Sequence, residues 1–160
     1  NAKKLFDKSD VKPSDYHPED VRINSAGEKY SKILNRVFET SYDFSDYNRA
    51  SSIYWPGNRL GHGREDIAKF WNSLKNIFTE IKFSIEHVGY LDEPNKNPRA
   101  SIRWFLEGLH SNDSDDYGKK TNSKLFIMGI NHVELNKDGI IREWVLFDEV
   151  AIWKQILMNK

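Results

Sequence analysis

His132 and Trp144 are the two residues of this chain whose types and spacing most clearly suggest a catalytic site. An imidazole suits general acid–base catalysis because its unperturbed pKa, about 6.5, lies close to physiological pH. An apolar wall lowers that pKa and keeps the ring neutral, ready to accept a proton. An imidazole and an indole that project together into an apolar hollow would therefore form the catalytic part of a binding pocket.

Both residues belong to the stretch FIMGINHVELNKDGIIREWVLFDE, residues 126–149, which is typical of a long β-hairpin. Its turn, NKDG, fits a three-residue loop with Gly139 left-handed, because glycine enters that region without a Cβ penalty. This loop sets three pairs of residues opposite each other: Asn136 and Ile140, Glu134 and Arg142, and His132 and Trp144. A two-residue loop would oppose two glutamates, and like charges destabilise a ladder. The first register is therefore the predicted one.

A strand expected at residues 99–110 extends the same sheet. Trp104 and His110 share one side of that strand, and we expect this side to join the side of His132. Gly108 and Gly129 would let the sheet bend sharply around a pocket. The concave face formed in this way would carry five functional side chains: Trp104, His110, His132, Trp144 and Asp148.

Asp148 lies four residues along the sheet from the His132–Trp144 pair, on the order of 13 Å by strand rise. It can act on a different ligand atom, or it can cap the next helix at its N-terminus. Both roles stay open. A lone strand histidine is more often a packing residue than a catalyst, and the neighbouring indole is what favours chemistry at His132.

Sequence patterns of metal, nucleotide and serine-hydrolase sites are absent. The chain has no cysteine, no HxH or HExxH spacing and no GxSxG. The segment GNRLGHG, residues 57–63, follows no expected strand and lacks the lysine and serine of a phosphate-binding loop. We therefore expect neither a metal nor a cofactor.

The charge balance bounds the class of partner. Among 160 residues, lysines plus arginines equal aspartates plus glutamates at 24 each, so no net field favours nucleic acid or an anionic membrane. No apolar run approaches the roughly 18 residues that span a bilayer. The first residues lack the apolar stretch of a secretory signal. We expect a cytoplasmic protein, although a first residue other than methionine leaves export open.

The aromatic content is high, with five tryptophans, seven tyrosines and nine phenylalanines. Such residues most often fill a core, but they can also line a cavity for a flat apolar ligand. Composition alone does not decide between the two. For a cavity in this sheet, the expected lining residues are Trp104, Trp144, Trp55, Trp71, Met128 and Ile130.

The chain is long enough for one domain, expected over residues 26–160 after a polar arm over residues 1–25. Apolar residues at helical spacing predict three helices, within residues 27–44, 44–52 and 64–78. The spacing then changes to two, which predicts two strands, 82–92 and 99–110, before the hairpin and a short C-terminal helix. Helices followed by four antiparallel strands indicate an α+β fold with the helices on one face.

Six segments between Glu28 and Leu157 match a known pattern in order and spacing: GRED with its helix to residue 78, EH at 86–87, RWFLEGLHSN at 103–112, YGKKTN at 117–122, GINHVELNKDGIIREW at 129–144 and FDE at 147–149. Together they resemble the SnoaL-like polyketide cyclases of the NTF2-like superfamily. The resemblance implies a conical barrel in which N-terminal helices wrap a curved antiparallel sheet around an apolar cavity. It also implies a homodimer formed through the sheet.

The resemblance further implies ring closure by intramolecular aldol addition, with acid–base side chains and no cofactor. The family's GTH histidine falls on His110. Its catalytic aspartate falls on His132, where an imidazole replaces the carboxylate. The family's PTG reads Lys120-Thr121-Asn122 in this chain, and the glycine after the histidine is Asn112. These departures concern the substrate more than the fold.

Two functions follow as hypotheses. The first is a cofactor-free enzyme of cyclase, isomerase or dehydratase type that acts on a small apolar carbonyl compound. His132 would take the proton, with help from His110 or Asp148. The second is a non-catalytic NTF2-like module that binds a small molecule or dimerises, because a fold does not fix function.

Overall fold

A computed structural model describes residues 25–39 and 41–159. Apart from Ser25, the predicted N-terminal arm lies outside these residues. The described elements are three helices and six strands: α2 (Ser25–Val37), β1 (Tyr47–Trp55), β2 (Arg59–His62), α3 (Gly63–Lys75), β3 (Phe78–Leu91), β4 (Arg99–His110), β5 (Lys124–Asn136), β6 (Gly139–Phe147) and α4 (Glu149–Met158).

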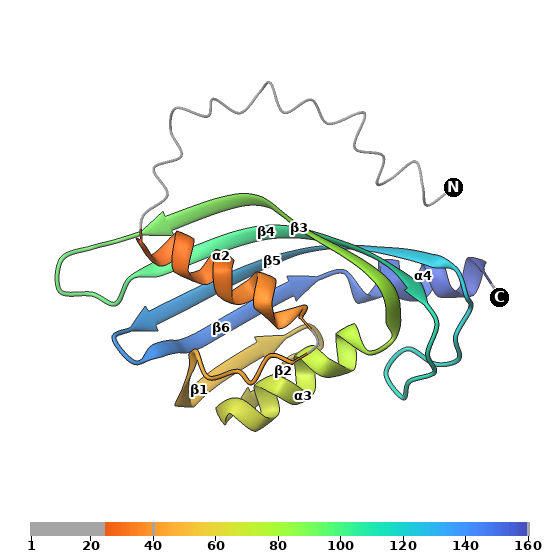
Figure 1. The fold of residues 1–160 in the computed structure, drawn as a ribbon, viewed down its shortest axis with the longest axis horizontal. Coiled ribbons are helices and arrows are strands. Elements are labelled where there is room, and N and C mark those ends of the chain that lie inside the picture. Colours follow the sequence, from red (N-terminus) through yellow and green to blue (C-terminus); the bar gives the residue numbers. More distant parts are fainter. Residues whose placement is uncertain (1–24, 40, 160) are drawn as a thin grey trace, which may run out of the picture.

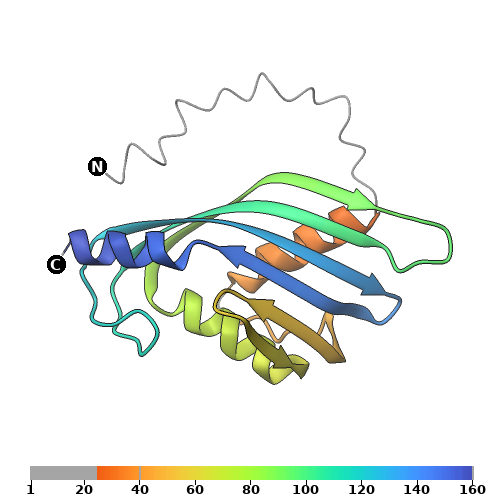
Figure 2. The same ribbon diagram turned by 180° about the vertical axis from the view of Figure 1, so that it is seen from behind.

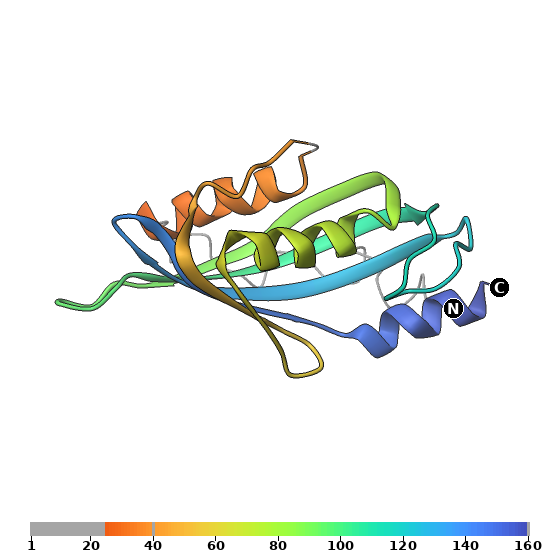
Figure 3. The same ribbon diagram turned by 90° about the horizontal axis from the view of Figure 1, so that it is seen from below.

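The strands form one curved sheet in the order β2-β1-β6-β5-β4-β3. Helices α2 and α3 cover one face of this sheet, and α4 continues from the end of β6 (Figure 1). From behind, the long strands pass in front of α2 and α3 (Figure 2). Figure 3 shows both helices on the same side of the sheet. We call the helix-covered face the inner face and the opposite one the outer face.

The α+β architecture is the predicted one, with two corrections. The helix predicted within residues 44–52 is wrong, because Tyr47–Trp55 forms strand β1. The sheet is also mixed, since β1 pairs in parallel with β6 while the other described pairs are antiparallel. It is open, with β2 and β3 at its two edges. The alternate residues Ser51 and Ile53 of β1 are fully buried, which is the period of a strand and not of a helix.

Helices α2 and α3 pack on the sheet because each has one apolar face. Tyr30, Ile33, Leu34 and Val37 of α2 are buried, as are Ile67, Phe70, Trp71 and Leu74 of α3. Glu28 in the first turn of α2 and Glu65 in that of α3 complement the helix dipoles. The helical spacing read from the sequence therefore marks the surfaces that close the inner face.

The β5–β6 hairpin keeps the predicted register along most of its length. Glu134 pairs with Arg142 and His132 with Trp144, whereas Leu135, not Asn136, pairs with Ile140. A register shift between Glu134 and Leu135 causes this difference. Gly139 has a φ of +123°, and a Cβ there would lie 2.1 Å from the Asp46 carbonyl oxygen. Glycine is therefore required at the turn for space as well as for conformation.

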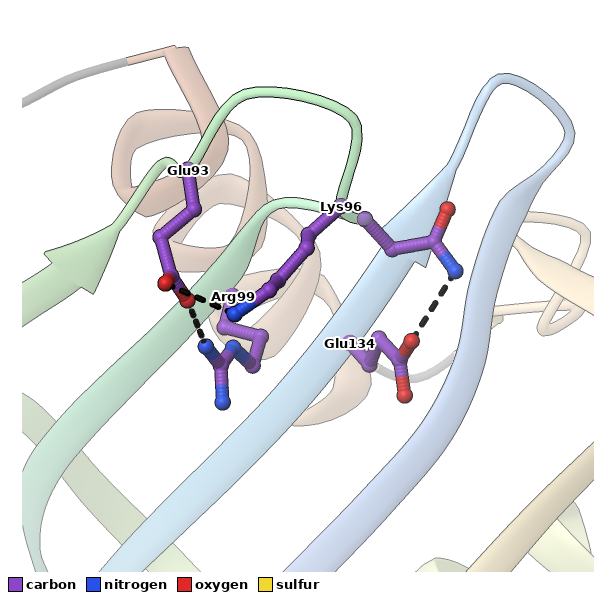
Figure 4. A network of polar contacts seen from close by, with 5 residues as sticks. Glu93, Lys96, Arg99 and Glu134 are labelled. Carbon is purple, nitrogen blue, oxygen red and sulfur yellow. Dashed lines mark hydrogen bonds and ion pairs between the residues drawn. The ribbon is translucent and has the colours of Figure 1, made fainter.

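The loop between β3 and β4 is fastened to this hairpin by a polar network (Figure 4). Glu93 bonds to Lys96 at 2.8 Å and to Arg99. The Asn97 amide donates to the Glu134 carboxylate at 2.9 Å. Exposed pairs of this kind contribute little stability, so their main effect is to hold the loop beside the hairpin.

Helix α4 follows β6 and packs beside β5 where β6 ends. The Asp148 carboxylate accepts a hydrogen bond from the Ala151 N–H at 3.0 Å and so caps the helix. Gln155 bonds to both backbone groups of Phe126, each at 2.9 Å, and thus replaces a strand partner. None of the described helices is long and apolar enough to cross a bilayer.

Candidate functional site

The His132–Trp144 pair forms as predicted, but on the outer face. The two residues are register partners, and their ring centroids lie 5.5 Å apart. His132 is exposed, and Trp144 is 37% exposed and stacks on Tyr54 at 5.6 Å. The expectation that these rings project into an apolar hollow is therefore wrong.

Trp104 lies on the inner face and does not share a side with His132. Its register partner is Gly129, whereas that of His132 is Ser101. Because side chains alternate along a strand, Trp104 is grouped with the odd-numbered residues of β5. The predicted alignment of the two strand faces was wrong by one residue.

The inner face carries a buried carboxylate, Glu143, that the sequence analysis did not select. Its Oε1 accepts hydrogen bonds from the Tyr30 hydroxyl and, at 2.8 Å, from the Asn131 amide. Its Oε2 accepts from the Tyr47 hydroxyl at 2.8 Å and from the Trp71 indole at 3.3 Å. Four donors from α2, β1, α3 and β5 converge on this carboxyl group. We call these five residues the Glu143 cluster.

Two opposing effects act on the ionisation of Glu143. Burial raises the pKa of its carboxyl because a buried charge loses its hydration, while the four hydrogen bonds lower it. Burial is the larger effect, so the pKa of Glu143 lies above its ordinary value. Burial and the nearby carboxyl also raise the pKa of Tyr30 and of Tyr47, which keeps both hydroxyls protonated. Glu143 is thus the member of the cluster that gains or loses a proton most readily.

Trp104 fixes the orientation of the amide in this cluster. Its indole N–H donates to Asn131 Oδ1 at 2.7 Å. The amide nitrogen must then face the other way, and it donates to the Tyr30 hydroxyl oxygen at 2.7 Å and to Glu143 at 2.8 Å. In the part of β5 where the family resemblance places a catalytic group, the interior residue is therefore Asn131 and not His132.

A local irregularity of β6 decides which residue enters the interior. Ile140 is buried before the register shift and Glu143 is buried after it. The residues that face the interior therefore change from even-numbered to odd-numbered positions within the strand. One signal in the sequence could have revealed the site. Glu143 alternates with Val145 and Phe147, and Asn131 alternates with apolar neighbours in the same way, so each is a polar residue in an apolar row.

Aromatic rings surround the cluster on the inner face. Trp71 and Trp104 are fully buried, with ring centroids 6.4 Å apart. Trp55 is half-buried and packs on Phe70 at 4.9 Å. Of the predicted lining residues, Trp71 therefore belongs to the Glu143 cluster, Trp104 adjoins it, and Trp55 lies at the rim of the same aromatic group.

The other predicted residues lie elsewhere. Met128 and Ile130 are exposed on the outer face with Trp144, so they do not line the interior. Asp148 is exposed and caps α4. Of its two predicted roles, the helix cap is therefore the one that the structure shows.

His110 is buried at the end of β4, outside the Glu143 cluster. Its Nδ1 lies 3.3 Å from the Thr121 hydroxyl, and its Nε2 has no hydrogen-bond partner among the described residues. Burial lowers the pKa of this imidazole, while the charge of Asp113 acts in the opposite direction. The ring is therefore biased toward its neutral form.

A groove of about 510 Å³ opens where the start of α2, the β3–β4 loop and the β5–β6 turn meet. Its lining includes Lys29 and Lys137 but no member of the Glu143 cluster. Within residues 25–39 and 41–159, no three histidine or acidic side chains are grouped as metal ligands would be. The chemistry available in the interior is therefore that of a carboxyl group among hydroxyl, amide and indole donors.

Comparison with sequence-family models finds no match, and neither does comparison with curated proteins. Solved structures do match. A proposed SnoaL-like polyketide cyclase from Shewanella putrefaciens has a TM-score of 0.66 and 17% identity, covering 86% of this chain and 88% of that one. IdmH, a proposed polyketide cyclase from Streptomyces antibioticus, has a TM-score of 0.64 and 12% identity, covering 83% and 99%.

The chain has a SnoaL-like fold. An NTF2-like protein of unknown function from Cytophaga hutchinsonii also matches, with a TM-score of 0.53 and 10% identity, covering 77% of this chain and 99% of that one. At these identities the likeness concerns the SnoaL-like, NTF2-like architecture. Activity has to be argued from the side chains of this chain.

Proposed function

We propose that the protein is a cyclase- or isomerase-type enzyme that performs cofactor-free acid–base chemistry on a small apolar carbonyl compound, with Glu143 as the group that exchanges the proton. The observation that carries the proposal is a fully buried carboxyl group held by four donors inside an aromatic interior. A titratable group whose pKa is raised by burial and fixed by specific partners is typical of acid–base sites.

The arrangement suits abstraction of a proton from the carbon beside a carbonyl group. Glu143 takes the proton, the C–H electrons form the enolate C=C bond, and the carbonyl π electrons move to oxygen. Of the four donors, Trp71 makes the longest hydrogen bond, 3.3 Å to Oε2, so a substrate C–H displaces it at the least cost. Tyr47 donates to the same oxygen and keeps the carboxylate oriented. Returning the proton to another atom would complete an isomerisation, and attack of the enolate on a second carbonyl would close a ring.

The test is hydrogen–deuterium exchange at the carbon beside the carbonyl, followed by NMR in D₂O with a panel of small apolar ketones. Glu143→Gln keeps the shape of the side chain and removes the base, so we expect exchange to slow by about 10²- to 10⁴-fold. His132→Ala, a change in the exposed imidazole of β5, is the matched control and should leave the rate unchanged. Equal rates for wild type and Glu143→Gln would refute the proposal.

A second candidate function is a non-catalytic module that binds a small molecule or dimerises, and the outer face supports it. Met128 is 54% exposed and Leu146 66% exposed. Ile130 is the register partner of Leu146, and Trp144 lies two residues before Leu146 on the same face of β6. Contiguous exposed apolar side chains of this kind are typical of interaction surfaces. We propose a homodimer through this surface, which is compatible with either function. Binding of ketones without exchange across the whole panel would favour the non-catalytic module.

A further inference from the structure

A serine and a histidine are hydrogen-bonded on the outer face, away from the Glu143 cluster. Ser52 of β1 and His62 of β2 are register partners, and the Ser52 hydroxyl oxygen lies 3.1 Å from His62 Nδ1. When the ring carries its proton on Nε2, Nδ1 accepts the hydrogen bond that the hydroxyl donates. A hydroxyl held against an imidazole in this way is the basic arrangement of a nucleophile and its general base. We call these two residues the Ser52–His62 pair.

The backbone holds both members of the pair in place. Strand β1 lies between β2 and β6 in the sheet, so Ser52 is held by a ladder on each side. The His62 N–H donates to the Asp66 carboxylate at 2.8 Å, and helix α3 begins at the next residue. Ser52 is half-buried and His62 is exposed, so the pair is open to a small molecule. It is therefore both positioned and accessible.

A cation lies on the other side of the serine. Arg142 of β6 is the register partner of Ser52 across the parallel ladder, and neighbouring strands lie about 4.8 Å apart. The Arg142 guanidinium donates to the Glu134 carboxylate at 3.2 Å, which orients it, and it has more N–H donors than this bond uses. Negative charge that develops on a carbonyl oxygen beside Ser52 would therefore face a fixed positive charge.

The next row of side chains on the same face is apolar. Tyr54, two residues after Ser52, is the register partner of Leu60, two residues before His62. Leu60 is 48% exposed. Side chains two residues apart on a strand are separated by roughly 7 Å, which is about the width of an aromatic ring and its substituent. An aromatic group can therefore rest on Tyr54 and Leu60 while an attached carbonyl lies at Ser52.

We infer that the Ser52–His62 pair is a second reactive site, which hydrolyses small esters of aromatic alcohols. Ser52 Oγ attacks the ester carbonyl carbon, its proton passes to His62 Nδ1, and the carbonyl π electrons move to the oxygen beside Arg142. As these electrons return, the bond to the leaving alcohol breaks, and the alcohol oxygen takes the proton from His62. Water then attacks the acyl-serine and gives a proton to His62, which returns it to Ser52 Oγ as the acid leaves. This activity is independent of the proposed function, because the pair lies on the opposite face from Glu143.

The test treats the full chain with p-nitrophenyl acetate near neutral pH. Absorbance follows the release of p-nitrophenolate, and mass spectrometry follows the acetyl group on the peptide that contains Ser52. Ser52→Ala removes the nucleophile and His62→Ala removes the base, so each should slow release about 10²-fold. Arg142→Gln should slow it about tenfold, because water weakens charge stabilisation at an exposed site. His132→Ala, which removes another exposed imidazole of the outer face, is the matched control and should leave the rate unchanged.

Equal rates for wild type and Ser52→Ala would overturn the inference. So would a loss of rate in His62→Ala that Ser52→Ala does not share, because the imidazole itself would then be the nucleophile. Acetyl groups on lysines with none on Ser52, or a His132→Ala variant as slow as His62→Ala, would show only the general reactivity of exposed side chains and would also contradict it. Substitutions at such unburied positions change stability little, so a slower variant reports on the chemistry and not on unfolding.

Discussion

The indole ring of Trp104 lies directly across the backbone of Gly129, its register partner on the next strand. A Cβ at Gly129 would lie 2.1 Å from Trp104 Cζ2 and 2.4 Å from Cε2, so only glycine leaves room for the ring. In this position the Trp104 N–H reaches Asn131 Oδ1 at 2.7 Å. The orientation of the Asn131 amide in the Glu143 cluster therefore depends on the lack of a side chain at Gly129.

We expect Gly129→Ala to destabilise the protein by about 3 kcal/mol, because the ring must move and a buried hydrogen bond is lost. Gly89→Ala is the matched control, since the nearest atom to its Cβ would lie 3.9 Å away. That variant should stay within about 0.5 kcal/mol of wild type. Urea unfolding measures both changes, and equal effects would mean that the contact at Gly129 relaxes without loss.

The elements of this fold could be predicted where the signal is local. The spacing of Tyr30, Ile33 and Leu34 predicted α2, and the turn with Gly139 predicted the hairpin and the His132–Trp144 pair. These features depend on neighbours within one helix or one turn. Strand β1 was missed because Phe44, Tyr47 and Ala50 recur at helical spacing, although β1 pairs with the nearby β2 as well as with β6, far along the chain.

The wrong face of the hairpin was predicted because both faces are rich in apolar residues. Ile130 and Leu146 lie on one face, and Val133 and Val145 lie on the other. Alternation alone does not say which face the helices cover, and the register shift in β6 changes the parity again. Choosing the wrong face exchanged Asn131 for His132 and concealed Glu143.

The stability of the fold should depend on pH through Glu143. Because burial raises the folded-state pKa of this carboxyl above 4.5, its usual value, the protonated form is the one favoured by folding. Its contribution is present in full below the unfolded-state pKa and is lost as pH rises through the folded-state pKa. The unfolding free energy of wild type minus that of Glu143→Gln should therefore fall as pH rises above 4.5, the ordinary carboxyl value.

Each unit of pKa elevation lowers that difference by about 1.4 kcal/mol. Urea unfolding of both proteins at several pH values gives the slope. Glu134→Gln, a change in the carboxylate that bonds to Arg142 on the surface, controls for the loss of one negative charge. A difference that grows with pH would mean that the four hydrogen bonds outweigh burial.

The outer face should govern assembly. A dimer of the 18.8 kDa chain through Ile130, Trp144 and Leu146 would bury apolar side chains that are exposed in one copy. Ile130→Glu and Leu146→Glu should therefore each yield monomers, measured by light scattering after size-exclusion chromatography. Leu91→Glu, at the end of edge strand β3 and also exposed, should leave the dimer intact. A wild type that is monomeric at high micromolar concentration would contradict the proposed homodimer.

Substitutions at Asp148 test whether its carboxylate is needed for stability or for catalysis. Its side chain accepts a hydrogen bond from the Ala151 N–H at the start of α4, so Asp148→Ala should lower stability by about 1 kcal/mol. Asp148→Asn keeps a capping oxygen and should lose much less. Both variants should exchange ketone protons at the wild-type rate, because the carboxylate is exposed and occupied at the helix end. A large loss of exchange in Asp148→Asn with unchanged stability would instead give Asp148 the catalytic role.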